Sequence, residues 1–279
     1  MNDLGDGAVM RILWLGLIGA VAVAGAGQFM LAKAFRDKAA ALAAELRGAP
    51  VAGARPDLPP AVAAFARRAG AQPGARAAVL EQSAELRLKQ GGGFSATTAR
   101  QTVALAVPGF VWDARQGFGP LTVVRVIDSY VDGRGLLEAR LFGSIRVARA
   151  ADASVSLAEA YRYLAELPWA PDAILGNPAV AWRMLADGRA EAALDTPAGR
   201  AAVIFAFDAA GDIVAMEARD RPAQDAAGKA ARYDWRARFW DYGPVGPRRL
   251  PRQGEVGYVH PEGFETYFKG RITGYTLVE

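Results

Sequence analysis

Three charged residues have the types and spacing to form an ion cluster with a function. Arg162 and Glu166 are four residues apart, so on a helix they share a face and can pair. If that face is buried against a sheet, the charges need further partners, which Asp128, Arg125 or Arg219 could provide. Such a cluster is either a structural ion-pair network or the polar part of a binding cleft.

Side chains for acid–base or metal chemistry are scarce in this sequence. The only histidine, His260, precedes a proline in a predicted turn, where a histidine is usually solvated, so a serine–histidine mechanism is not expected. The absence of cysteine excludes disulfides, thiolate metal sites and a cysteine nucleophile. No calcium-binding loop, phosphate-binding loop or dinucleotide motif is present, so neither a metal nor a cofactor is predicted.

Aromatic residues accompany the charged ones in the sequence. A mostly apolar surface with a few convergent polar groups is typical of a small-molecule pocket. The residues predicted to bind a ligand are Phe110, Trp112, Asp128, Arg162, Tyr163, Glu166, Trp169 and Trp182. The alternative interpretation is that the aromatic side chains are all core.

A helical insert is expected to position these residues. Ser156 and Glu159 have the spacing of a capping box, and Pro168 and Pro171 end the helix. Its apolar face is predicted to cover a sheet, with Glu159, Arg162 and Glu166 lying off that face. A second helical piece is expected around 179–185, which places the central helices at 156–186.

Short β-like segments lie on both sides of the insert. They are predicted at 80–89, 99–107, 109–115, 121–131 and 135–147, and again at 189–195, 200–207, 213–218, 233–240, 255–259, 263–268 and 271–277. Sequential hairpins favour one large antiparallel sheet. We therefore expect an α+β fold in a single domain, 57–279: a curled sheet of about ten strands, a half-barrel or open barrel, with a few helices on its concave side.

The N-terminal part predicts a membrane anchor. After the flank 1–11, residues 12–32 form an uncharged run of 21 residues, which as a helix matches a hydrocarbon core of about 30 Å. A helical extension and linker follow at 33–56. A cleaved signal peptide is the alternative, with a cleavage site at Ala24-Gly25-Ala26. We favour an uncleaved, single-pass anchor in a bacterial inner membrane. The charges that flank it leave open on which side the domain lies.

Composition narrows the class of partner. The chain has a net charge of only +4, and its basic residues are scattered among acidic ones, so nucleic-acid binding is not predicted. The predicted partners are the membrane and a hydrophobic small molecule or lipid, and a protein partner is left open.

Several motifs resemble an uncharacterised bacterial family of unknown function that often has an N-terminal membrane segment. The resemblance covers roughly residues 57–279 and rests on Pro108-Gly-Phe-Val-Trp-Asp-Ala114, Asp128-x-Tyr130, Arg162-Tyr-Leu-Ala-Glu-x-x-Trp-x-Pro171, Trp182, Asp208-x-x-Gly211, Arg219, Pro251, Gly263 and Tyr267-Phe-x-Gly270. It implies no activity and no catalytic residues. The expected layout also resembles the half-barrel of periplasmic lipoprotein carriers, a likeness of architecture alone.

Three functions are compatible with this sequence. The first is a membrane-tethered module that binds an apolar or lipid-like ligand in the trough of the sheet. The second is an enzyme that acts on an envelope or lipid substrate through acidic residues such as Glu166 and Asp128. The third is a scaffold or interaction domain without a ligand. We favour the first.

Overall fold

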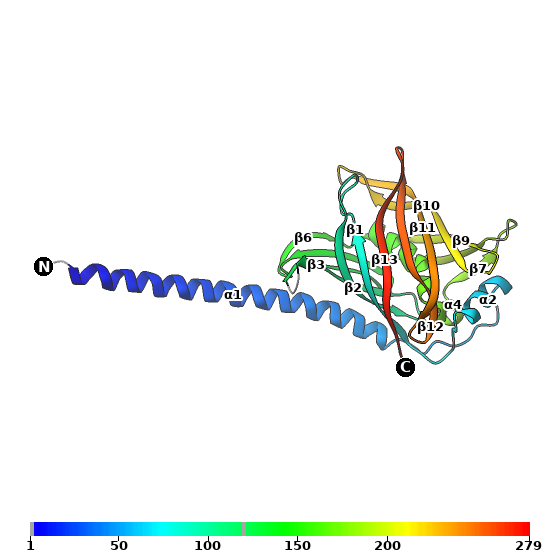
Figure 1. Ribbon diagram of the computed structural model, residues 1–279, viewed down its shortest axis with the longest axis horizontal. Coiled ribbons are helices and arrows are strands. Elements are labelled where there is room, and N and C mark those ends of the chain that lie inside the picture. Colours follow the sequence, from blue (N-terminus) through cyan, green and yellow to red (C-terminus); the bar gives the residue numbers. More distant parts are fainter. Residues whose placement is uncertain (1–2, 119–120) are drawn as a thin grey trace.

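One curled antiparallel sheet of 13 strands dominates the protein (Figure 1). The computed structural model describes residues 3–118 and 121–279, and it describes side chains from residue 24 onward. The strands follow one another in two meanders, and the strand order runs β6-β5-β4-β3-β2-β1-β13-β12-β11-β10-β9-β8-β7. Pairing of β1 with β13 joins the meanders, and β6 and β7 are the free edges. The predicted curled sheet is confirmed, with more strands than expected.

The first meander contains β1 (Ala77–Leu86), β2 (Ser95–Ala104), β3 (Phe110–Phe118), β4 (Leu121–Val131), β5 (Arg134–Leu141) and β6 (Ile145–Ala150). The second contains β7 (Ala181–Met184), β8 (Ala190–Thr196), β9 (Gly199–Phe207), β10 (Ile213–Gln224), β11 (Ala230–Val245), β12 (Arg248–His260) and β13 (Gly263–Val278). The predicted turn at Asp132-Gly133 is present, with both residues at positive φ as a tight hairpin requires. Phe142 and Gly143, also at positive φ, divide the strand predicted at 135–147 into β5 and β6.

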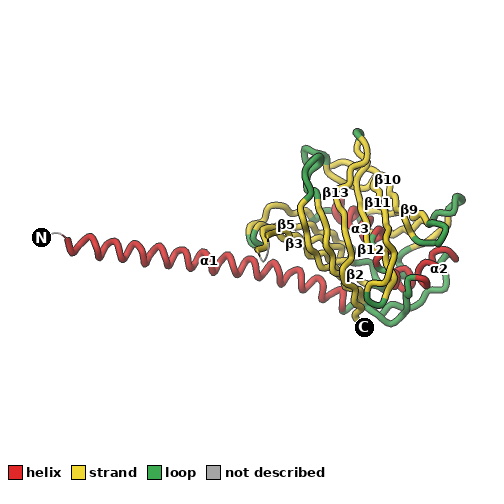
Figure 2. The backbone as a smooth tube through the Cα atoms, in the orientation of Figure 1, coloured by secondary structure: helices red, strands yellow, loops and turns green. Residues whose placement is uncertain are grey.

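The helical insert lies inside the curl, between the two meanders (Figure 2). It consists of α3 (Ala153–Ala165), the 3-10 turn η1 (Leu167–Trp169) and α4 (Pro171–Gly176). The helix α3 contacts β4 and β5 on one side and β8, β9 and β10 on the other. Because the sheet surrounds α3, nine of its 13 residues are buried, including Glu159 on the face that the sequence placed away from the sheet.

Two details of the predicted insert are wrong. The N-cap of α3 is Asp152, whose carboxylate accepts a hydrogen bond from the Val155 amide at 2.9 Å, whereas Ser156 lies within the helix. Residues 179–185 do not form a helix: Trp182 lies on edge strand β7, opposite Ala192 of β8. Strand pairing therefore overrides the local helical pattern, and the central helices end at Gly176.

Two further helices precede the sheet, α1 (Asp3–Arg47) and α2 (Pro60–Arg68). The C-terminal half of α1 packs on the convex face of the first meander, where Phe35 and Ala39 cover Ile127. Lys38 also pairs with the buried Glu138 of β5 at 2.7 Å. The predicted extension is thus part of the domain surface. The linker is also fixed to the domain. Its Arg55 donates hydrogen bonds to the Val180 carbonyl at 2.6 Å and to the Asn177 carbonyl at 2.9 Å.

The described residues contain no helix that is long and apolar enough to cross a membrane. The predicted span, 12–32, includes residues 12–23, whose side chains lie outside the described part of the chain. The span therefore stays a prediction.

One glycine shows how closely the insert is fitted to the sheet. A Cβ atom at Gly254 of β12 would lie 2.7 Å from Cζ2 of Trp169 and 3.2 Å from the Arg238 carbonyl oxygen. We expect Gly254→Ala to lower the free energy of unfolding by about 1–3 kcal/mol, because an overpacked core must shift. Chemical denaturation measures this. Gly93→Ala, where a Cβ meets open space, is the matched control. Equal unfolding midpoints for the two variants would contradict the close packing.

Candidate functional site

The structure brings five of the eight predicted residues together around Arg162. The Arg162 guanidinium donates a hydrogen bond to Asp128 of β4 and another, at 3.3 Å, to Glu166 one turn further along. Its charged carbon lies 4.8 Å from the centre of the Phe110 ring and 5.1 Å from that of Trp112. Cations in such positions over aromatic rings are stabilised electrostatically. Asp128 therefore partners Arg162, while the other suggested partners, Arg125 and Arg219, do not join the cluster.

Two charged residues of the same cluster were missed from the sequence, Glu159 and Arg221. Glu159 lies on α3, three residues before Arg162, and is buried. Arg221 of β10 is buried too, and it donates hydrogen bonds to the Tyr258 hydroxyl and, at 3.1 Å, to the Ala158 carbonyl. Its guanidinium lies 4.5 Å from the Trp235 ring centre. We call the five charged residues Asp128, Glu159, Arg162, Glu166 and Arg221 the interior charge cluster.

Burial shifts the protonation of two acids in the interior charge cluster. The pKa of Glu159 is raised well above its ordinary 4.5, first by burial and then by the negative charge of Asp128 and a hydrogen bond to it. Both causes favour the neutral form of Glu159. Burial also raises the pKa of Glu166, although the positive charge of Arg162 favours its charged form.

A chain of side-chain hydrogen bonds leads to this cluster from the sheet. The indole nitrogen of Trp112 donates to Oε1 of Gln82 at 2.8 Å, and Nε2 of Gln82 donates to Oε1 of Gln101, also at 2.8 Å. Several buried polar atoms at its end have no partner among the described residues: Nε2 of Gln101, Oδ1 of Asp128, Oε2 of Glu159 and Oε2 of Glu166. Buried polar atoms are normally paired with protein or water. These four atoms therefore have hydrogen-bonding capacity that the described residues do not use.

The other three predicted residues lie elsewhere in the protein. The Tyr163 hydroxyl accepts a hydrogen bond from Asn177 at 2.6 Å, on another face of α3. The Trp169 indole donates to the Pro251 carbonyl at 2.7 Å and packs edge-on against a core phenylalanine. Trp182 stacks on Phe205 near the β7 edge. These three positions therefore form no common pocket with Arg162.

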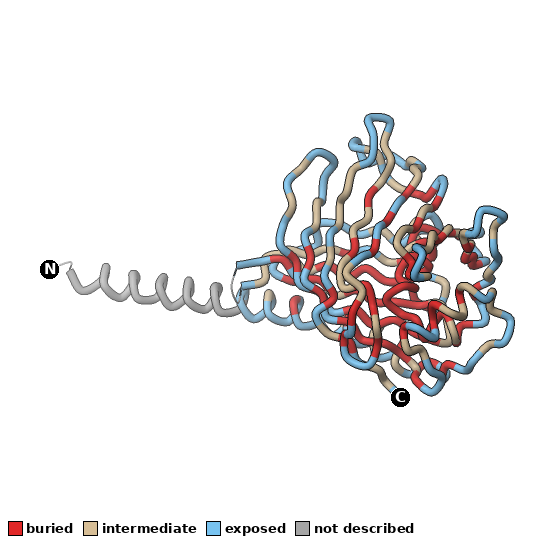
Figure 3. Tube along the Cα trace, turned by 45° about the vertical axis from the view of Figure 1, so that its right-hand side comes forward, coloured by how far each residue is buried: buried red, intermediate tan, exposed pale blue. Residues whose placement is uncertain are grey.

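A row of concave side chains shows which part of the trough is uncovered. Paired residues on seven adjacent strands form the row Leu86, Phe268, Val256, Ala237, Met216, Phe205 and Ala190. Its four members on β8 to β11 are buried, whereas the three on β1, β13 and β12 are only half-buried. Figure 3 shows that burial also changes along the long central strands, from buried to intermediate and exposed residues. The concave face is therefore partly open at these central strands.

Tyrosines connect this open part of the trough to the interior charge cluster. Tyr258 and Tyr267 are half-buried, and their rings stack with centres 5.3 Å apart. Tyr258 accepts the hydrogen bond of Arg221, and Tyr267 accepts one from the Trp235 indole at 3.1 Å. We use the term open trough for Leu86, Val256, Tyr258, Tyr267 and Phe268. It is an apolar and aromatic surface next to the interior charge cluster.

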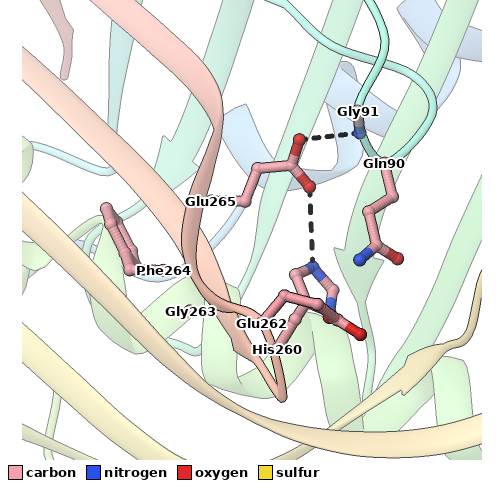
Figure 4. Close-up of a pocket in the computed structure, with 7 residues that line it drawn as sticks. All are labelled: Gln90, Gly91, His260, Glu262, Gly263, Phe264 and Glu265. Atoms are coloured by element: carbon pink, nitrogen blue, oxygen red, sulfur yellow. Dashed lines mark hydrogen bonds and ion pairs between the residues drawn. The ribbon is translucent and has the colours of Figure 1, made fainter.

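His260 lies at the outer end of the same strands. It lines a pocket of about 240 Å³ together with Gln90, Glu262 and Glu265 (Figure 4). Its Nε2 is 3.9 Å from Oε2 of Glu265, and the side chain is only 11% exposed. The expectation of a solvated histidine is therefore wrong. The Tyr233 ring, centred 4.7 Å from the imidazole, covers it.

Comparison with known proteins identifies the family of this domain. A family of unknown function, DUF6544, matches residues 51–270, more than three quarters of the chain. The chain belongs to this family. The DUF6544 match contains every motif residue named above, from Pro108 to Gly270, so the family resemblance seen in the sequence is confirmed. No curated protein matches the sequence.

Solved structures with a similar chain path have low sequence identity. One is a domain proposed to be an outer membrane lipoprotein-sorting protein from Vibrio parahaemolyticus, with 12% identity and a TM-score of 0.43 over 77% of this chain and 90% of that chain. A DUF1329 family protein from Desulfovibrio piger has 7% identity and a TM-score of 0.43 over 78% and 90%. A LolA superfamily protein from Nitrosomonas europaea has 8% identity and a TM-score of 0.41 over 78% and 94%.

Proposed function

We propose that this DUF6544 protein is a membrane-tethered module that binds an apolar, lipid-like ligand in its open trough. The observation that carries the proposal is the half-buried apolar group of Leu86, Phe268 and Val256, in the same row as the buried residues of β8 to β11. Leaving apolar side chains open to water costs about 25 cal/mol for each Å². A hydrocarbon chain lying along the row would remove that cost.

The interior charge cluster suits the polar end of such a ligand. Unpartnered oxygens of Asp128, Glu159 and Glu166 and the amide nitrogen of Gln101 offer acceptors and a donor. Arg162 and Arg221 supply positive charge beside them. A ligand with an apolar chain and a hydrogen-bonding or anionic head therefore fits both parts of the trough.

The tether is part of the same proposal. The uncharged run 12–32 lies within α1, and α1 continues without interruption onto the convex face of the sheet. A helix of 21 residues is about 30 Å long, which equals the thickness of a hydrocarbon core. The trough would thus be held close to a source of lipid.

The enzymatic alternative has less support in the geometry. General acid–base chemistry requires carboxyl groups that reach the substrate. Asp128 and Glu166 both accept hydrogen bonds from Arg162, and Asp128 also lies beside Glu159. A ligand-free scaffold would require a fully covered concave face, and the row at β1, β13 and β12 is half-buried instead.

Photo-crosslinking in vesicles tests the proposal. The full chain is incorporated into vesicles that contain palmitic acid with a diazirine group near its methyl end, illuminated, and digested for mass spectrometry. We expect labelled peptides from β1, β12 and β13 in addition to residues 12–32. Labels confined to residues 12–32 would contradict binding in the trough. An absence of labels in residues 12–32 would contradict the tether.

A matched pair of variants localises the binding. Leu86→Glu places a carboxylate in the apolar row, and we expect it to reduce crosslinking of the domain about tenfold, because burying an unpaired charge is costly. Leu88→Glu makes the same change at a side chain that is 63% exposed, and it should leave crosslinking unchanged. Labelling of residues 12–32 provides the internal reference. Equal crosslinking in the two variants would contradict binding in the open trough.

A further inference from the structure

An exposed apolar surface lies where the first meander meets the middle of α1. The hairpin that joins β5 and β6 carries Phe142, Ile145 and Val147, which are 48%, 54% and 54% exposed. Leu121 of β4 is 57% exposed. It lies at the same end of the sheet, as the pairing of Val124 with Leu141 shows. Single exposed apolar residues are ordinary, but a contiguous group indicates an interaction surface. We call these four residues the hairpin patch.

The hairpin patch is fixed to one level of α1. The hydroxyl of Ser144 donates a hydrogen bond to Oε1 of Gln28 at 2.6 Å. A Cβ atom at Gly143 would lie 3.2 Å from Cβ of Ala32. The hairpin therefore contacts the helix between residues 28 and 32, and Figure 1 shows this end of the sheet beside α1.

That level of α1 is the end of the uncharged run. Residues 12–32 carry no charge, and Lys33 is the first charged residue after them. Gln28 to Ala32 covers four steps along the helix, or about 6 Å. Helix residues Phe29, Met30 and Leu31 are also 62%, 69% and 54% exposed. If the run spans a bilayer, the hairpin patch lies at the boundary between hydrocarbon and head groups.

Charge around the hairpin patch fits the same boundary. Lys33 and Arg36 follow the run on α1, and Arg146 lies between Ile145 and Val147 in the sequence of β6. Arg36 and Arg146 form no ion pair with any residue in the described part of the chain. Basic side chains beside exposed apolar ones are typical of proteins that lie on anionic lipid surfaces.

From these contacts we infer that the hairpin patch inserts into the head-group region of the bilayer that α1 enters. The inference rests on the tether in the proposed function and adds a second contact with the membrane. A single helix leaves the domain free to tilt, whereas a second contact sets its orientation. The partner is a phospholipid surface with anionic lipid, and the apolar side chains enter it beside Arg146.

Spin labels in the full chain test this inference, and the absence of native cysteine makes single-site labelling direct. Ile145→Cys carries a nitroxide in the hairpin patch. Ala210→Cys carries one in an equally open turn, beside α2, because Arg68 of α2 contacts Gly211. Both chains are incorporated into vesicles of phosphatidylcholine with a minority of phosphatidylglycerol, and flotation is measured first.

We expect the ratio of oxygen collisions to collisions with a water-soluble nickel complex to be several-fold higher at Ile145→Cys than at Ala210→Cys. Equal ratios in chains that float with the vesicles would overturn the hairpin contact and leave the tether standing. Chains that do not float would overturn both. Adding urea to unfold the domain should bring the two ratios together, because the patch is then no longer fixed to α1.

Discussion

Arg162→Ala is expected to lower the free energy of unfolding by about 3–5 kcal/mol, because removing one partner from a buried ion pair leaves the other charge uncompensated. Asp128 and Glu166 would both lose the guanidinium that donates to them. The rings of Phe110 and Trp112 would also lose the cation that lies against them. Denaturation of the full chain in detergent, followed by tryptophan fluorescence, measures the loss.

Two further variants make the result interpretable. Arg134→Ala removes an arginine from an ion pair with Asp132 in which both side chains are largely exposed, so it should leave the unfolding midpoint unchanged. Arg162→Lys keeps a positive charge but loses the two-sided hydrogen bonding, so an intermediate loss is expected. If Arg162→Ala unfolds at the same denaturant concentration as Arg134→Ala, the interior charge cluster does not stabilise the fold.

Glu159→Gln is expected to stabilise the protein in alkaline solution. The pKa of Glu159 is raised in the folded protein by burial, then by Asp128, above its value of 4.5 in the unfolded chain. The stabilising contribution of such a group is complete below pH 4.5 and is lost as the pH rises through the folded pKa. Glutamine does not ionise, so the variant does not lose this stability as the pH rises.

The size of this effect follows from the shift. Each unit by which the folded pKa exceeds the unfolded one is worth about 1.4 kcal/mol. As the pH rises above about 4.5, the free energy of unfolding should therefore fall more steeply in the native chain than in Glu159→Gln. A shallower slope remains in the variant, because the pKa of Glu166 is raised as well.

Urea denaturation at several pH values measures both slopes. Glu262→Gln, in the exposed turn between β12 and β13, is the matched control and should keep the slope of the native chain. Identical slopes for the native chain and Glu159→Gln would show that Glu159 is already ionised in the fold. The raised pKa of Glu159 would then be wrong.

The sheet could be predicted from the sequence because hairpin turns and two-residue alternation are local signals. Asp132-Gly133, for example, specifies a tight turn through its backbone conformation. Trp182 shows where local signals fail. Its segment reads as a helix, yet pairing with β8 and stacking on Phe205 place it in a strand. Those contacts come from residues distant in the sequence.

Part of the site depends on features that the sequence pattern hides. Arg219 and Arg221 should point the same way on a regular strand, but the register of β10 shifts between Ala218 and Arg221. Asp220 has a φ of 50° at this bulge. Arg219 is therefore exposed while Arg221 turns inward. Alternation alone cannot locate such a bulge.

Glu159 was missed for a different reason. A helix with one apolar face normally exposes the opposite face, so Glu159 was expected away from the sheet. The curl of the sheet covers α3 from both sides and buries that face too. Arg162 and Glu166 could be predicted as a pair because their spacing is local, whereas the contribution of Asp128 depended on how β4 meets α3.

The pairing of β1 with β13 also governs the order in which the fold can form. Ala77 lies opposite Val278, so this pair joins segments from the two ends of the domain. Each meander can assemble from neighbouring hairpins, but closing so long a loop is slow and comes late. During synthesis on the ribosome, β1 therefore keeps one unpaired edge until β13 has been made. Such an edge is where a chaperone is most needed, because it can pair with another nascent chain.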